Sequence, residues 1–166
     1  MKIKKGIPLI DQHDKHGFWG GKFGGSYIPE TLRKPIDDLT IKFEKLRKDK
    51  KFLAERDYYY NNWVHKGPTP FIKLENLTNH LGGAQIYAKV VSAARGGAHK
   101  IYGAITAAML CKKMGKRYLV TDTGAGYNGK MFSIAAKHFG LKCKVFMGHR
   151  DVQRQKPNVD AMKKNR

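Results

Sequence analysis

The chain has 166 residues, with 41% hydrophobic and 11% aromatic residues, which is enough for one domain with a hydrophobic core and excludes a disordered chain. No stretch approaches 18 consecutive apolar residues, so we expect no membrane-spanning helix. Cys111 and Cys143 are too few for a disulfide scaffold and have no partner at metal-ligand spacing. We therefore predict two free thiols, no metal site and an intracellular protein.

The net charge of +20 comes from 33 Lys and Arg residues against 13 Asp and Glu residues. The imbalance is concentrated in residues 76–166, which hold 17 basic and three acidic residues. A field of this size destabilises a compact domain by self-repulsion unless a polyanion or counterions offset it. We therefore expect RNA or another polyanion as a partner. The candidate contact residues are Lys112, Lys113, Lys116, Arg117, Lys142, Lys144, Arg150, Arg154, Lys156, Lys163, Lys164 and Arg166.

The N-terminal part begins with a basic extension, residues 1–17, whose four-residue apolar run is too short for a secretory signal. Glycines alternate with aromatic residues up to residue 28, which indicates an ordered loop whose aromatic rings pack on a neighbour. Apolar residues at steps of three and four then predict an amphipathic helix that opens at 29–31 and ends in the basic run 48–51. A second helix is predicted from 52 to about 63.

A Gly-Pro-Thr-Pro segment at 67–70 breaks this helical pattern. The remaining chain alternates between strand and helix patterns, separated by glycine turns. This alternation predicts an α/β fold, with a parallel sheet covered by helices in three layers. The expected helices are 74–80, 99–114, 130–139 and a last one from 151, and the expected strands are 85–91, 117–121 and 142–147.

Two short motifs suggest chemistry. Lys100 follows a glycine turn at the start of a predicted helix, where its amine is placed to form an imine, and His99 beside it is placed to contact a phosphate. The loop before the helix at 130–139 exposes backbone N–H groups that suit a carboxylate. Each motif also has a purely structural explanation, a solvated lysine or a tight turn. The loop residues are Thr123, Gly124, Ala125 and Gly126.

Taken in order, these segments resemble the tryptophan synthase beta chain family, pyridoxal-phosphate (PLP) enzymes of fold type II. The resemblance covers residues 18–166 and implies the N-terminal domain of that family, incomplete relative to the family. It implies that 67–94 is a crossing segment that needs an external partner, because its strand at 85–91 has no sheet of its own to join. The motifs that carry the resemblance are 23–32, 67–70, 97–100, 114–126 and 147–162.

The resemblance implies roles for individual residues. Lys100 matches the Schiff-base lysine, His99 is the neighbour of the cofactor phosphate, and Asp122 takes the place of the family's catalytic Glu. Residues 123–126 match the loop that binds the substrate carboxylate.

Several departures from the family pattern favour an inactive relic. Residues 89–96 replace polar and acidic groups around the cofactor with small or apolar ones, and Tyr102 adds bulk near the expected ring. Asp122 is one methylene shorter than Glu, and a displacement on the order of 1 Å can cost ~10²-fold in rate. Tyr127 and Asn128 replace a Gln-His pair. The family's C-terminal half supplies the phosphate cup and the partner of the ring nitrogen, so we expect no bound cofactor here.

Three functions remain open at this point. The first is a catalytically inactive, truncated protein that serves as a basic structural component of a large assembly, binding RNA in a ribosome-like particle in the mitochondrial matrix or the cytoplasm. The second is a PLP-dependent lyase half-enzyme completed by another chain. The third is a basic accessory subunit of a protein or membrane complex. We expect protein neighbours to cover residues 67–94: a second copy of the chain, another protein or a larger assembly.

Overall fold

A computed structural model describes residues 4–14 and 16–165 of the chain. The chain forms two compact units, Met1–Ile41 and Lys42–Arg166. The first long helix, α1 (Glu30–Leu46), crosses the boundary between them. It confirms the predicted amphipathic helix and ends just before the basic run 48–51.

The N-terminal unit is built around a small antiparallel hairpin of β1 (Phe18–Trp19) and β2 (Phe23–Gly24), preceded by a 3-10 turn at Leu9–Asp11. The rings of Phe18 and Trp19 pack within the unit, whereas Phe23 and Tyr27 are exposed. The Trp19 indole donates a hydrogen bond to the Leu9 carbonyl at 2.7 Å, and the Phe18 ring lies where a Cβ on Gly25 would be only 2.5 Å away. The glycines at these positions therefore let the backbone approach the rings closely.

The second unit begins with α2 (Lys50–Tyr59), which continues into a π-helical turn, η2 (Tyr60–Val64). These two elements occupy the segment predicted as one helix over 52–63. Asp49 caps α2 because its carboxylate accepts the backbone N–H groups of Phe52 at 3.0 Å and Lys51 at 2.8 Å. The bond from Phe52 is the largest cause of a lowered pKa of the Asp49 carboxyl group.

The C-terminal part has the predicted α/β alternation. Helix α4 (Lys100–Lys113) precedes two parallel strands, β5 (Tyr118–Thr123) and β6 (Lys142–Met147), and α5 (Tyr127–Phe139) connects the strands. Gly140 ends α5 in the left-handed conformation, as predicted. The last two helices are α6 (His149–Arg154) and α7 (Lys156–Lys163).

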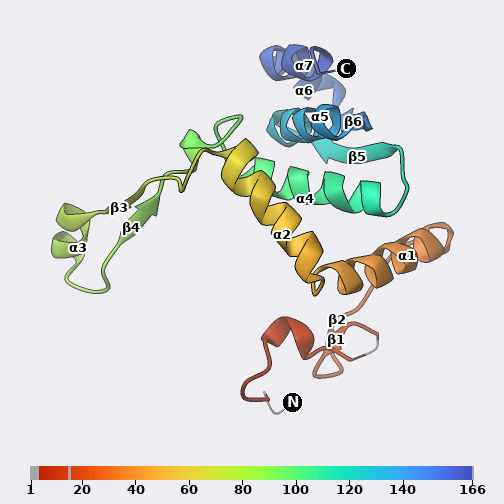
Figure 1. Cartoon of the computed structure of the whole chain (residues 1–166), viewed down its shortest axis with the longest axis horizontal. Coiled ribbons are helices and arrows are strands. Elements are labelled where there is room, and N and C mark those ends of the chain that lie inside the picture. The colour runs from red at the N-terminus through yellow and green to blue at the C-terminus, as the bar shows by residue number, and fades with distance from the viewer. Residues whose placement is uncertain (1–3, 15, 166) are drawn as a thin grey trace. The chain divides into compact units, whose positions relative to one another are not determined.

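The hydrophobic core lies between α4, α5 and one face of the β5–β6 sheet (Figure 1). Ile101, Ile105 and Met109 of α4 and Met131 of α5 are almost completely buried there. On the opposite face of the sheet, Tyr118, Val120 and Phe146 remain more than half exposed. The described residues thus form the sheet and the helical layer on one side of it, which is an incomplete version of the predicted three-layer fold.

Residues 71–89 form a hairpin arm that extends away from the core layers (Figure 1). The hairpin arm contains β3 (Phe71–Lys73), α3 (Glu75–Leu81) and β4 (Tyr87–Lys89). The prediction that the strand near 85–91 has no sheet of its own was wrong, because β4 pairs antiparallel with β3, with Phe71 opposite Lys89. The chain turns back after α3, so the two short strands can meet locally. A 3-10 turn at Val91–Ala93 then leads toward α4.

Both cysteines are free thiols, as predicted. Cys111 is buried and Cys143 is half-buried, and burial raises the pKa of each thiol. Across the part of the chain that the structure describes, every helix is too short or too polar to cross a bilayer.

Candidate functional site

Lys100, Asp122 and the predicted carboxylate loop line one pocket of about 190 Å³. Lys100 is the first residue of α4, and Asp122 lies near the carboxyl end of β5, with its side chain exposed. The structure therefore brings together the two predicted catalytic positions, which are 22 residues apart in the sequence. The other lining residues are Thr123, Gly124, Ala125, Tyr127 and Asn128.

The turn before Lys100 is fixed against the start of α5. Gly96 has φ +83°, and a Cβ on it would lie 2.4 Å from the Met131 sulfur, so only glycine allows this approach. The Tyr127 hydroxyl donates a hydrogen bond to the Gly96 carbonyl. Tyr127, a departure from the family pattern in the sequence, thus ties the start of α5 to the turn that carries Lys100.

Two asparagines hold the carboxylate loop in place. The Asn158 side chain, from α7, donates to the Ala125 carbonyl at 2.8 Å. The Asn128 side chain donates to the Thr121 hydroxyl at 2.7 Å and to the Asp122 carbonyl at 3.0 Å. Gly126 does not line the pocket; its Cα lies against Asn158, where a Cβ would be 2.7 Å from the Asn158 Cβ.

Sequence reasoning found Asn158 only as part of a matched motif and assigned it no role. The Ala125 carbonyl lies 33 residues earlier in the chain, so no local pattern connects the two. The same holds for Tyr127, whose partner Gly96 lies 31 residues earlier.

The pocket combines an amine, a carboxylate and a helix N-terminus. The 13-residue helix α5 starts directly after the loop, and its N-cap residue Gly126 has no side chain to satisfy the first N–H groups. The unsatisfied N–H groups and the positive end of the helix dipole favour an anion such as a carboxylate. Lys100 also lines this pocket, and a lysine amine can act as a nucleophile toward a carbonyl group.

Two other predicted residues lie elsewhere. His99 is exposed and does not line the pocket. Tyr102 also does not fill the pocket, contrary to the expectation that it adds bulk there, because two helical residues turn it about 200° away from Lys100. Its ring packs on Tyr60 of η2 at 5.0 Å, and the Tyr60 hydroxyl donates to the Tyr102 carbonyl at 3.1 Å. Burial raises the pKa of Tyr102.

The predicted nucleic-acid contacts are spread over several elements. Lys113 forms an ion pair with Glu55 of α2 at 3.0 Å and is therefore engaged within the fold. Lys142 and Lys144 lie together on the open face of the sheet. Arg166 lies outside the described residues. The others lie at the end of α4, in the loop before β5, and on or after α6 and α7: Lys112, Lys116, Arg117, Arg150, Arg154, Lys156, Lys163 and Lys164.

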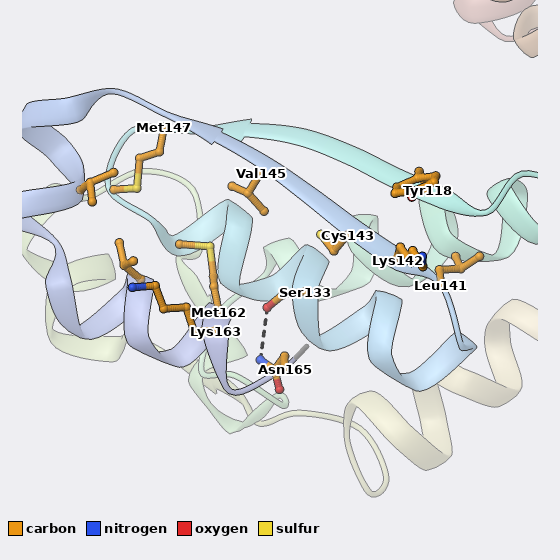
Figure 2. A pocket seen from close by; sticks show the side chains of 12 residues that line it. Tyr118, Ser133, Leu141, Lys142, Cys143, Val145, Met147, Met162, Lys163 and Asn165 are labelled. Atoms are coloured by element: carbon orange, nitrogen blue, oxygen red, sulfur yellow. Dashed lines mark hydrogen bonds between the residues drawn. The ribbon is translucent and has the colours of Figure 1, made fainter.

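A second, larger pocket of about 530 Å³ lies between β6, α5 and α7 (Figure 2). Much of its lining is apolar, with Cys143, Val145 and Met162 among the residues around it. The Asn165 side chain donates to the Ser133 hydroxyl at 3.2 Å in its wall. No motif in the sequence indicated this pocket, because its lining comes from β5, α5, β6, α6 and α7, which meet only in the fold.

The chain belongs to the family of pyridoxal-phosphate dependent enzymes, whose model matches residues 63–165. Within that class, it is 42% identical over 149 residues to the tryptophan synthase beta chain of Fusobacterium nucleatum subsp. nucleatum. The aligned region covers 90% of this chain and 37% of that relative. The family resemblance predicted from the motifs is confirmed, and the chain spans little more than a third of the curated relative that it matches.

The described residues fit one part of a PLP site. The Lys100 amine suits the covalent link to the cofactor aldehyde, and the loop and helix N-terminus suit an anion. The pocket of about 190 Å³ is smaller than the ~300–1,000 Å³ typical of small-molecule sites. These residues would therefore supply only one wall of such a site, and further groups would be needed to enclose the cofactor.

Proposed function

We propose that this chain supplies the lysine-bearing wall of a PLP-dependent lyase site of the tryptophan synthase beta type, completed by another polypeptide. The observation that carries the proposal is the single pocket lined by Lys100, Asp122 and the loop at 123–125. Membership of the PLP-dependent family supports it independently.

Each wall residue has a distinct role in this proposal. Lys100 holds the cofactor through its amine, and the bound cofactor supplies the electron sink that stabilises negative charge on the substrate. The loop at 123–125 and the N-terminus of α5 bind the substrate carboxylate. Asp122 also lines this pocket, and in this proposal its carboxylate accepts or returns a proton. Asn158 holds the loop in position, and Tyr127 holds the turn before Lys100 in position.

The test is to add PLP to the purified chain, reduce the adduct with borohydride and locate the label by mass spectrometry. We expect labelling at Lys100 and an absorbance band that is lost in Lys100→Ala. Lys112→Ala, an exposed lysine in the same helix, is the matched control and should leave both signals unchanged. Labelling spread equally over surface lysines would contradict the proposal.

A second candidate function is a non-catalytic, basic structural component that binds RNA in a large intracellular assembly, such as a ribosome-like particle in the mitochondrial matrix. The charge distribution favours it, because residues 76–166 hold 17 basic and three acidic residues. Affinity for RNA would fall steeply with salt, because each neutralised phosphate releases counterions. Co-purification with protein partners but no RNA would favour an accessory subunit of a protein complex instead.

A further inference from the structure

The open face of the β5–β6 sheet carries aromatic and basic side chains in a regular array. Residues alternate between the two faces along each strand, so Tyr118, Val120, Lys142, Lys144 and Phe146 share the uncovered side. The parallel register places Tyr118 opposite Lys142 and Val120 opposite Lys144. Tyr118 is 53% exposed and Phe146 57% exposed, a large apolar surface in contact with water.

Each exposed ring has an ammonium group beside it. The Lys142 Nζ atom lies 5.7 Å from the centre of the Tyr118 ring, and the Lys144 Nζ atom lies 5.8 Å from the centre of the Phe146 ring. Lysine side chains are long and mobile, so both ammonium groups can turn toward a ligand while the rings stay on the sheet.

This chemistry restricts what can cover the face. An apolar helix would bury Lys142 and Lys144 without partners, which is costly. An occupant that offers negative charge together with flat apolar groups matches both the lysines and the rings. Asp122 is the one acidic residue among the outward residues of these two strands, and it lies at the Phe146 end, opposite that residue in the register.

Single-stranded RNA has both required properties, since its unpaired bases stack on aromatic rings and its phosphates bind lysines. A duplex does not fit, because its bases are already stacked in pairs and cannot reach the rings. Tyr118 and Phe146 are four residues apart along the sheet, about 13 Å at ~3.3 Å per residue, which leaves room for two separate bases.

We infer that the open face of the β5–β6 sheet is a binding site for single-stranded RNA. Tyr118 and Phe146 stack on unpaired bases, and Lys142 and Lys144 contact the phosphates. The inference rests on the RNA-binding candidate function and assigns that function to one face.

The test measures binding of a fluorescent single-stranded oligouridylate to the full chain by anisotropy over a range of salt. Replacing both rings, Tyr118→Leu with Phe146→Leu, should weaken binding by on the order of 10-fold for each lost stacking partner. The matched control, Tyr58→Leu with Phe71→Leu, removes two rings elsewhere that are somewhat more exposed and should leave affinity unchanged. Because all four rings are exposed, circular dichroism should show an intact fold in both variants.

The role of Lys142 and Lys144 is tested by the salt dependence of the RNA affinity. Lys142→Gln with Lys144→Gln should reduce the slope of log affinity against log salt by about 1.4, since each phosphate contact on a single strand contributes ~0.7. Lys45→Gln with Lys48→Gln, two exposed lysines at and just after the end of α1, is the control and should leave the slope unchanged.

Different results would contradict the binding site on the sheet and the RNA-binding function on which it rests. If wild-type chain binds RNA but the ring variant binds equally well, the site is overturned and the RNA-binding function stands. If the chain binds no RNA at low salt, both are overturned. A duplex of equal length that binds as tightly, or polyglutamate that competes as well as RNA, would overturn base stacking. Loss of self-association in the ring variant, with no change in RNA affinity, would assign the face to a second copy of the chain.

Discussion

The hairpin arm and the core layers are built from the same kinds of residues but are stabilised differently. In the layers, Ile101, Ile105 and Met131 are completely buried between α4, α5 and the sheet. In the hairpin arm, Phe71 is 66% exposed and Leu81 61% exposed, and the described strands pair only with each other. Burial of apolar surface is the dominant favourable term in folding, so the layers supply most of the stability of this unit.

The two regions therefore depend on different contacts for their stability. A two-stranded hairpin by itself is marginal in water and depends on a neighbour to hold it. The layers bury a contiguous core through contacts between α4, α5 and β5. We therefore expect substitutions in the two regions to differ in how much unfolding free energy they cost and in how many elements they affect.

The largest effect should come from the centre of the layers. Ile105→Ala removes a completely buried side chain and leaves a cavity, which should cost about 2–5 kcal/mol of unfolding free energy. Urea denaturation followed by circular dichroism measures this loss. Ile72→Ala in the hairpin arm, at 49% exposure, is the comparison and should cost much less. Similar losses of unfolding free energy in the two variants would contradict the proposed difference between the two regions.

A smaller effect should come from Gly126, where the layers meet the Lys100 pocket. Gly126→Ala places a Cβ 2.7 Å from the Asn158 Cβ in a backbone with φ +81°, which should cost about 1–3 kcal/mol. The change should also displace the carboxylate loop and weaken anion binding at the pocket. Gly140→Ala also has positive φ, +67°, but nothing within 4 Å, so it measures the backbone strain alone. Equal losses for both variants would mean that the contact with Asn158 is unimportant.

A still smaller and more local effect is expected in the hairpin arm. The Phe71 and Tyr87 rings stack with centres 4.9 Å apart and planes within 6°. Phe71→Ala should therefore cost about 0.2–1 kcal/mol, the usual range for a cross-strand pair. Hydrogen exchange should speed up at the amides of β3 and β4 and stay unchanged in α4. Faster exchange in α4 would show that the hairpin arm and the layers unfold together.

The smallest effect should be a pH dependence at the edge of the layers. Burial, and then the charge of Arg95, lowers the pKa of His138 below its ordinary value of 6.5. The folded state therefore binds fewer protons than the unfolded state just below pH 6.5. The neutral His138 side chain therefore makes its full contribution to the free energy of unfolding above pH 6.5. This contribution declines as the pH falls toward the folded-state pKa of His138.

His138→Phe keeps an aromatic ring beside Trp63 and Tyr59, whose ring centres lie 4.3 and 5.4 Å from that of His138, and removes the titration. The midpoint of thermal unfolding should fall less between pH 7.5 and 5.5 in this variant than in the wild-type chain. Parallel curves for the two proteins would show that His138 does not titrate differently on folding.

Much of the fold was predictable because its signals are local. The strand at 142–147 was predicted with its observed limits, and the helix at 99–114 was within one residue of α4 at each end. The small strands at 18–19, 23–24 and 71–73 were missed, since two or three residues carry no detectable period. Pairing of β4 with β3 was missed for the same reason, because its partner was not recognised as a strand.

The sequence by itself determined the family, the α/β alternation and the candidate residues Lys100, Asp122 and 123–126, because spacing and residue type are local properties. The tertiary structure decided that most of these residues share one pocket, that Tyr102 turns away from it, and that Asn158 and Tyr127 fix its walls. It also decided which face of the sheet stays open to water. Each of these depends on contacts between residues far apart in the chain, and such contacts follow only from the packing of whole helices and strands.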